Sequence, residues 1–360
     1  LRGLSFGLSN ATLLLVAYLE MSAATSETAL LGFDGMYVND PMAAWLKCFA
    51  ALAMAVTLVY ARPFAADFDM LRGGELFSLS LFALLGMFVM ISGHHFLVLY
   101  LGLELLTLSS YALVALRRDD AVATEAAMKY FVLGAMASGF LLYGLSLVYG
   151  ATGSLDINTV ALNLSSVSTD MHLVLVLGVV FVVAGLAFKL GVVPFHMWVP
   201  DVYHGAPTAV TLIIAGAPKL AAFALVMRLL VEALPSLAFD WQQMVAVLAV
   251  ASLLIGNLAA VAQSNIKRML AFSTIAQMGF LLLAFVAGIV SGDTSNMSTA
   301  YSAGMFYVVT YVLTTLATFG VLMLMSRNGV EVQALSDLSG LNQRSPFLAA
   351  VMAACMFSPA

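Results

Sequence analysis

The sequence predicts an all-α protein that crosses a membrane many times, and three observations lead to this fold class. Hydrophobic residues fill 62% of the 360 positions and charged residues only 9%, whereas soluble domains carry about a quarter charged residues. Apolar runs of roughly the 20 residues that a bilayer-crossing helix needs recur along the whole chain. Cations gather on one side of these runs. A water-soluble fold is therefore excluded, and no basic tract suggests a nucleic-acid partner.

Ten apolar runs bounded by polar turns are expected to be complete spans. They cover residues 4–19, 41–61, 76–92, 95–116, 127–149, 172–195, 207–231, 241–262, 270–290 and 300–325. An eleventh begins near Phe347, and because the chain starts at Leu1 and stops inside this run, we interpret it as a fragment. The first run resembles a signal peptide in length, but Glu20 and Glu27 follow it without a small-residue cleavage site, so we expect a spanning helix.

The cations between spans indicate the orientation in the membrane. Alternating sides along the ten spans places nine cations on one side, namely Arg2, Arg62, Arg72, Arg117, Arg118, Lys267, Arg268, Arg327 and Arg344, and only Arg228 on the other. The cation-rich side is cytoplasmic by the positive-inside rule. One missed helix would scramble this distribution, so the distribution supports the number of spans.

Two consecutive spans are expected to be broken helices. Gly191 and Pro194 interrupt the sixth span after Lys189, and Gly216 and Pro218 interrupt the seventh before Lys219. Proline removes a backbone donor and clashes with the preceding turn. The freed polar groups survive in a membrane only where protein or water meets them. Paired breaks beside charges therefore indicate an ion path.

Three ionisable residues lie inside spans: Glu104, Lys189 and Lys219. A charge near the bilayer centre costs at least about 2.5 to 3.5 kcal/mol on insertion scales, so each needs a partner or a function. A static ion pair between Glu104 and a lysine is one alternative. The other is proton transfer, because burial disfavours a lysine's charge and a neighbouring carboxylate restores it.

Other polar residues have two interpretations each. Lys129 opens the fifth span and either snorkels to the cytoplasmic surface or takes part in function, whereas snorkelling is favoured for Lys47. His196 and His204 flank the segment after the first break and are either proton relays or plain hydrogen-bonding residues. His94 and His95 are expected to be structural. Gly134 and Ser138 are expected to allow close helix packing. Ser273, Thr274 and Gln277 are expected either to hold water or to join helices.

The cysteines give no sign of a metal or redox centre. Cys48 and Cys355 lie far apart, and neither belongs to a CxxC or His-Cys ligand spacing. Neither a disulfide framework nor a zinc, haem or iron-sulfur site is supported.

Three long segments resemble a known family. They are residues 102–156, beginning GLELLTLSSYALVALRRDD, residues 188–224, FKLGVVPFHMWVPDVYHGAPTAVTLIIAGAPKLAAFA, and residues 265–280, NIKRMLAFSTIAQMGF. They resemble the antiporter-like membrane subunits of bacterial NADH-quinone oxidoreductase, respiratory complex I, a family related to the cation/proton antiporter Mrp. The resemblance covers essentially the whole chain.

The resemblance implies an antiporter-like bundle of two inverted five-helix repeats, each with a broken helix. Residues 1–61 would then form N-terminal flanking helices, residues 76–231 the first repeat and residues 241–360 a truncated second repeat, all within a single membrane domain. The family's coupling glutamate matches Glu104, its pumping lysine Lys189 and its central relay lysine Lys219. Lys129 and His196 match further relay positions, while the family's exit lysine would lie beyond residue 360.

The resemblance also implies the enzyme context. The chain would be a multi-pass subunit in the bacterial inner (plasma) membrane, surrounded by the lipid bilayer, and part of a proton-translocating NADH:quinone reductase. NADH, FMN, iron-sulfur clusters and quinone are expected in partner subunits, with no cofactor, metal or redox centre in this chain. The partners would be the antiporter-like subunit M and small membrane subunits.

Two other functions stay open at this level. A stand-alone Mrp-like cation/proton antiporter or a solute carrier would use the same broken helices and buried charges. A solute carrier should show substrate-specific polar groups at the midplane, and the sequence shows a row of lysines instead. A scaffold whose buried charges only fix helix register is the third alternative.

Overall fold

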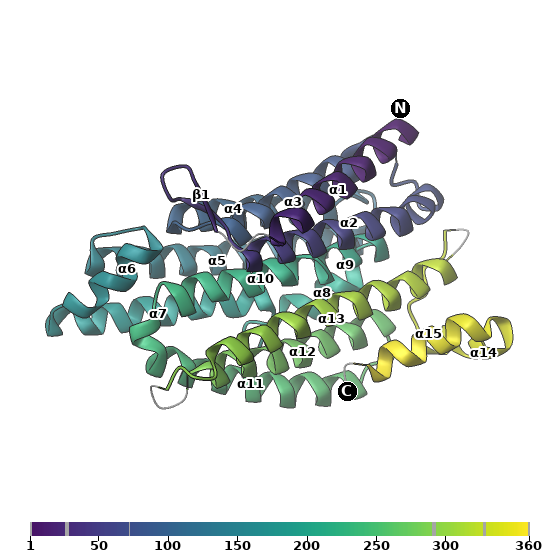
Figure 1. Cartoon of the computed structure of the whole chain (residues 1–360). Coiled ribbons are helices and arrows are strands. Elements are labelled where there is room, and N and C mark those ends of the chain that lie inside the picture. The colour runs from purple at the N-terminus through teal and green to yellow at the C-terminus, as the bar shows by residue number, and fades with distance from the viewer. Residues whose placement is uncertain (1, 26–28, 72, 290–292, 327–328, 359–360) are drawn as a thin grey trace.

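The computed structural model of the chain is a bundle of long helices that run alongside one another (Figure 1). It describes residues 2–25, 29–71, 73–289, 293–326 and 329–358. Of the residues used above for orientation and for the first span, Glu27, Arg72 and Arg327 lie outside the described residues, and so does the side chain of Arg2.

The ten expected spans are confirmed: among the described residues, ten helices are long and apolar enough to cross a membrane. The long helices are α1 (Arg2–Ala24), α2 (Pro41–Asp67), α3 (Glu75–Ser92), α4 (Phe96–Val114), α5 (Ala121–Thr152), α7 (Thr169–Leu190), α11 (Ala238–Val261), α12 (Ile266–Gly288) and α13 (Met297–Met325). The seventh span is built from α9 (Thr208–Ala215), α10 (Pro218–Val226) and the π-helical η2 (Met227–Glu232). The expected eleventh run forms α15 (Pro346–Phe357) beside α13.

Short elements join the spans. They are the hairpin strands β1 (Leu30–Gly32) and β2 (Tyr37–Asn39), and the helices α6 (Ile157–Asn163), η1 (Leu164–Ser166), α8 (Trp198–Gly205), η3 (Pro235–Leu237), η4 (Leu335–Leu338) and α14 (Leu341–Arg344). Several helices begin where a short polar side chain accepts a hydrogen bond from a free backbone N–H, as at Asp40, Asp120, Asp156 and Asn265. Helix starts therefore follow local sequence.

Small residues let neighbouring helices approach closely. A Cβ atom on Gly86 would lie 2.5 Å from the backbone nitrogen of Leu106, and one on Gly102 would lie 2.6 Å from that of Met90. The backbones of α3 and α4 thus touch, as membrane helices do where small residues face each other. This contact fixes the position of α4, which carries Glu104.

Both predicted breaks are present. Helix α7 ends at Leu190, followed by Gly191 at a positive φ of 81° that favours glycine. Helix α9 ends at Ala215, and α10 restarts at Pro218 after Gly216. The π-helical turn that ends the seventh span has no counterpart in the sequence prediction. Helices α9 and α10 are buried among α2, α3, α7 and α13, so the broken span lies at the centre of the bundle (Figure 1).

Candidate site of buried charges

Lys189 and Lys219 come together at the two breaks. Lys189 occupies the last turn of α7, and Lys219 is the second residue of α10, directly after Pro218. Lys189 is 8% exposed and Lys219 only 2%. Lys189 interacts electrostatically with both Lys219 and Glu104. Lys189 is therefore the predicted residue that is coupled to each of the other two.

Lys219 binds the polar group that the first break frees. Its Nζ donates a hydrogen bond to the carbonyl oxygen of Leu190, the last residue of α7, at 2.8 Å. The last carbonyls of a helix have no partner within the helix. Its ammonium also lies 5.7 Å from the ring centre of Trp198, within the range of a cation–π contact. The end of one broken helix thus holds the charged start of the other.

The segment after Gly191 is held by protein on both sides. The indole Nε1 of Trp198 donates to the Phe188 carbonyl at 3.0 Å, and the Val193 N–H donates to Ser252 Oγ on α11 at 2.9 Å. These contacts satisfy the backbone groups that the break exposes, as a non-helical segment at membrane depth requires. The Val193–Pro194 peptide is cis.

Glu104 is half-buried near the middle of α4, with hydroxyl partners. Ser138 Oγ on α5 donates to its carboxylate, and Tyr100 one turn earlier is a second hydrogen-bonding partner. Ser138 therefore binds Glu104 in addition to the close helix packing expected of Gly134 and Ser138. Close packing is seen at Gly134, because a Cβ there would collide with the hydroxyl of Tyr111.

Glu104 and Lys189 interact without touching. Among the ion pairs between described residues, none joins Glu104 to a lysine, although the two groups interact electrostatically. The direct static pair considered as an alternative is therefore not the arrangement seen. Groups separated by more than a hydrogen bond exchange protons through an intervening water or a movement of the side chains.

Lys129 lies at the cytoplasmic edge and not in the buried row. Its side chain is 45% exposed and pairs with Glu125 at 2.8 Å and with Asp201 on α8 at 3.0 Å. Asp201 also binds Arg268 on α12 at 2.8 Å. Partial burial acts to raise the pKa of Asp201, but Arg268 and Lys129 outweigh it, and the pKa lies below its ordinary value. The sequence interpretation missed Asp201, which joins α5, α8 and α12.

The two histidines near the first break have different surroundings. Burial lowers the pKa of His196, and the Pro194 carbonyl acts in the opposite direction. His196 Nδ1 is buried and has no hydrogen-bond partner among the described residues. The pKa of His204 is lowered by burial and by the nearby cations Lys267 and Arg268. Of these two histidines, only His196 therefore has a buried nitrogen without a hydrogen-bond partner among the described residues.

Of the two outer-turn histidines, His95 has the structural role that we expect. His95 caps α4, because its Nδ1 accepts a hydrogen bond from the Leu97 N–H at 3.3 Å. His94 Nδ1 is buried 3.9 Å from the Glu232 carboxylate and has no hydrogen-bond partner among the described residues.

Two cations are buried in ion pairs that the sequence interpretation missed. Lys47 is fully buried and binds Glu20 on α1 and the Tyr37 hydroxyl, each at 2.9 Å. The predicted snorkelling of Lys47 is therefore wrong, since its ammonium lies inside the protein. Arg228 is 2% exposed and binds Asp40 at 2.8 Å and Glu232 at 2.6 Å. It is therefore not a free loop cation.

The polar residues of α12 both join helices and line a cavity. Thr274 and the Tyr311 hydroxyl on α13 are 2.8 Å apart, and Tyr307 donates to Gln277. Ser273, Thr274 and Gln277 also line a cavity of about 410 Å³. Both interpretations of these residues are therefore compatible with the structure.

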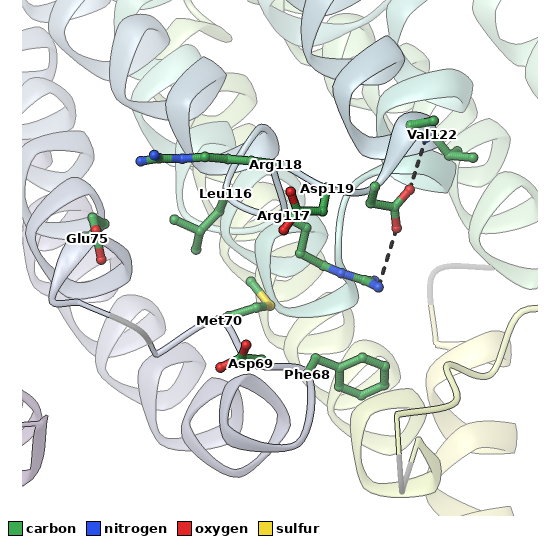
Figure 2. A pocket seen from close by; sticks show the side chains of 11 residues that line it. Phe68, Asp69, Met70, Glu75, Leu116, Arg117, Arg118, Asp119 and Val122 are labelled. Carbon is green, nitrogen blue, oxygen red and sulfur yellow. Dashed lines mark hydrogen bonds and ion pairs between the residues drawn. The ribbon is translucent and has the colours of Figure 1, made fainter.

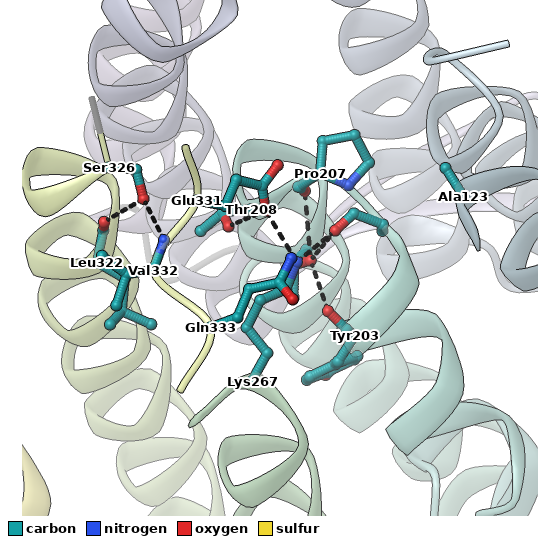
Figure 3. Close-up of polar contacts among 12 residues, drawn as sticks. Ala123, Tyr203, Pro207, Thr208, Lys267, Leu322, Ser326, Glu331, Val332 and Gln333 are labelled. Atoms are coloured by element: carbon teal, nitrogen blue, oxygen red, sulfur yellow. Dashed lines mark hydrogen bonds and ion pairs between the residues drawn. The ribbon is translucent and has the colours of Figure 1, made fainter. Parts of the chain in front are cut away.

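Lys267 is buried, although the sequence placed it among the loop cations. It is 0% exposed and binds Glu331, which follows α13 in the chain, at 3.4 Å (Figure 3). Glu331 also binds Arg117. The sequence offers no local signal for this cluster, because its members come from separate connections between spans.

A wide surface cavity lies near the cytoplasmic ends of α2 and α4 (Figure 2). It measures about 720 Å³ and is lined by Arg117 and Arg118 together with Asp69, Glu75 and Asp119. Arg117 points to Asp120 at 3.4 Å. Its charges are of both signs, so it does not select one kind of ligand. Within the part of the chain that the structure describes, no group of three or more His, Cys, Asp or Glu residues is placed to hold a metal ion.

The comparisons with known proteins agree with this architecture. A family model described as "NADH:quinone oxidoreductase/Mrp antiporter, TM" matches residues 93–360. The NADH-quinone oxidoreductase subunit N of Polaromonas naphthalenivorans is 67% identical over 357 residues, covering 99% of this chain and 71% of the relative. The protein of the same name from Herminiimonas arsenicoxydans is 58% identical over 360 residues, covering 99% of this chain and 73% of the relative.

Solved structures give the same result. A chain of respiratory complex I from Thermus thermophilus with bound aureothin matches with a TM-score of 0.74 and 32% identity, covering all of this chain and 78% of that one. A chain of the Mrp complex from Dietzia sp. DQ12-45-1b matches with a TM-score of 0.84 and 22% identity, covering 99% of this chain and 66% of that one. The Mrp match shows the shared fold alone. The family resemblance and the antiporter-like fold that it implied are confirmed.

Proposed function

The chain belongs to the NADH:quinone oxidoreductase/Mrp antiporter membrane family, and from this premise we propose that it is the proton-translocating membrane subunit of an NADH-quinone oxidoreductase. The relatives named subunit N support this function over a stand-alone Mrp-like antiporter, because they are far more similar in sequence. The chain would be a multi-pass protein of the bacterial inner membrane, packed against other membrane subunits of the complex.

We propose that Glu104, Lys189 and Lys219 carry the protons. The observation that supports this most is the contact of the Lys219 ammonium with the Leu190 carbonyl, one residue past Lys189. A carbonyl oxygen stabilises an ammonium but does not take its proton. A buried charge on Lys219 and one on Lys189 repel each other strongly in a medium of low dielectric constant. Protonation of one therefore favours release from the other, and Glu104 favours the charge on Lys189.

Lys129 and His196 are proposed auxiliaries. Lys129, paired with Asp201 at the cytoplasmic edge, would adjust the electrostatic potential at the cytoplasmic end of the row formed by Glu104, Lys189 and Lys219. His196 has a buried nitrogen free of hydrogen bonds to described residues, and it would accept or pass a proton next to the break. The two five-helix repeats, residues 76–231 and 241–360, also stay a proposal. The position of the first break at the end of α7, within the first of them, supports this division.

The redox chemistry is assigned to other subunits. NADH, FMN, iron-sulfur clusters and quinone would be bound by partners, and electron transfer there would drive the rearrangement of charges in this chain. The wide separation of Cys48 and Cys355 supports this division of work. The chain then contributes to the enzyme as a translocase and not as the site of oxidation.

Replacing Lys219 by Ala in the complete protein tests the function. The measurements are proton pumping and NADH:quinone reductase activity in inverted membrane vesicles, each per assembled complex. We expect pumping by the whole complex to fall and electron transfer to slow with it, because removing the ammonium interrupts the row. Lys47→Arg is the control, since it changes another buried lysine but keeps a cation beside Glu20. Unchanged pumping by assembled Lys219→Ala complexes would refute the proposed role.

A further inference from the structure

A short strap, which we define as residues 329–334, crosses the cytoplasmic ends of several helices. It is tied to the start of α12: the Ile266 N–H donates to the Gln333 carbonyl at 2.8 Å, and Asn265 and Ala334 form an antiparallel bridge. This pairing turns the Glu331 side chain inward, where it is only 6% exposed. A carboxylate is thus placed under the strap, inside the protein.

Three helix ends converge on the Glu331 carboxylate, and Figure 3 shows two of them, those that carry Thr208 and Lys267. Thr208 Oγ1, at the start of α9, donates to it at 3.0 Å, and Lys267 Nζ, at the start of α12, lies 3.4 Å from the same oxygen. Arg117, which follows α4, reaches the other oxygen at 3.3 Å. The carboxylate therefore joins the seventh span, which carries Lys219, to α12.

Lys267 has one contact that can take its proton. Its side chain is 1% exposed, so the ammonium does not reach bulk water directly. Its Nζ donates to the Ala206 carbonyl at 2.5 Å and to Glu331. A backbone carbonyl accepts a hydrogen bond but does not hold the proton, whereas a carboxylate does both. Among the described residues in contact with Lys267, Glu331 is thus the proton acceptor.

Glu331 in turn faces a small cavity that leads to the cytoplasmic side. The cavity measures about 140 Å³ and is lined by Arg117, Asp120, His204 and Glu331, which is room for several water molecules. The side chains of Arg117 and Asp120 are 33% and 29% exposed, so the cavity reaches the surface beside them. Water in this cavity can therefore reach the Glu331 carboxylate, through which a proton on the buried Lys267 has to pass.

A polar route continues inward from Lys267. Thr274 lies seven residues further along α12, which is two helical turns or about 10.5 Å on nearly the same face. It is 2.8 Å from the Tyr311 hydroxyl, and both line the cavity of about 410 Å³ described above. Thr274 and Tyr311 are thus the polar groups that lie about two helical turns inward from Lys267.

We propose that Glu331 and Lys267 form a second proton-loading pair, in which Glu331 takes protons from cytoplasmic water and passes them to the neutral amine form of the buried Lys267. The step moves one proton from the Glu331 carboxyl to a neutral Lys267 amine, and the reverse step releases it. This inference rests on the proposed proton-translocating function. It differs from a purely structural latch, in which the same contacts only tie helix ends together.

Lys267→Arg separates the two roles. A guanidinium keeps the positive charge and the ion pair with Glu331 but does not release a proton. A structural latch therefore tolerates this change, whereas a proton-loading pair does not. We expect pumping per assembled complex to fall at least about tenfold, because a positioned proton-transfer group contributes typically 10²- to 10⁴-fold. Lys47→Arg, the same change at another fully buried lysine paired with a glutamate, is expected to pump normally.

Glu331 is tested by a graded pair of variants in the same vesicles. Glu331→Gln keeps the shape and most hydrogen bonds but cannot take a proton, so pumping per assembled complex should fall as in Lys267→Arg. Glu331→Asp keeps the carboxylate and should retain most of the pumping. If Lys267→Arg reduces the amount of assembled complex, the two variants Glu331→Gln and Glu331→Asp decide between the proton-loading pair and the latch.

The outcomes separate this inference from the proposed function. Normal pumping by Lys267→Arg or by Glu331→Gln overturns the proton-loading pair, and so does equal loss in Glu331→Asp and Glu331→Gln, which indicates a latch. If Lys219→Ala abolishes pumping while these variants pump normally, only the further inference fails. If Lys219→Ala itself pumps normally, the proposed function fails.

Discussion

Ser252→Ala should loosen the segment that follows the first break. Ser252 is fully buried on α11, and its Oγ accepts the hydrogen bond of the Val193 N–H at 2.9 Å. After the substitution this N–H stays buried without that acceptor, which costs about 1 to 3 kcal/mol. Since each 1.4 kcal/mol is a factor of ten, the open form of the segment should become roughly 5- to 150-fold more populated.

Hydrogen exchange followed by mass spectrometry on the assembled complex measures this change. Backbone amides of residues 192–199 should exchange faster by that factor, because exchange follows the population of the open form. Pumping should fall as well, since the loosened segment follows the Leu190 carbonyl that holds Lys219.

Ser80→Ala is the matched control for Ser252→Ala. Ser80 is also fully buried, but its Oγ donates to the Leu76 carbonyl of its own helix, at 2.6 Å. Its removal leaves no N–H without a partner, so the change should be nearly neutral. Exchange at residues 192–199 that is equally slow in Ser252→Ala and in the unmodified protein would refute the reasoning.

Two further substitutions test the break and the cytoplasmic edge. Gly191→Ala should lower the yield of assembled complex and its pumping. A left-handed φ of 81° costs a residue with a side chain about 1 to 2 kcal/mol, and the added Cβ would lie 2.7 Å from Val199. Normal yield and pumping would contradict this. Asp201→Asn should weaken assembly by the same amount from pH 5 to 8, measured as the midpoint of thermal dissociation. The pKa of Asp201 is depressed, so its stabilising contribution is complete above its ordinary pKa of about 4 and is lost only as the pH falls through the lower folded value. A penalty that shrinks between pH 8 and pH 5 would show that Asp201 is not held in this way.

The arrangement around the breaks shows how far sequence reasoning reaches. Gly191 and Pro218 marked the ends of α7 and the start of α10 correctly, because glycine and proline act through their own backbone angles. The partner of Lys219 was not predictable in this way. The Leu190 carbonyl is available only because the helix ends there, and the two residues are 29 positions apart.

The errors share one cause. Lys47 was expected to reach the surface and Lys267 was counted in a loop, since both lie near the ends of apolar runs. Each is instead buried against a carboxylate, Glu20 for Lys47 and Glu331 for Lys267, the latter 64 positions away. Distance from a span end does not reveal burial when another segment covers that end.

The sequence by itself determined the number of spans, their approximate bounds and the two breaks. Each of these depends on short-range properties: the length of an apolar run and the backbone limits of glycine and proline. Only the tertiary structure decided which charges meet. It separated Glu104 from direct contact with Lys189, gave Lys219 a carbonyl and placed Glu331 beside Lys267. The physical reason is that side-chain partners in a helical bundle come from distant segments, whose packing depends on the whole fold.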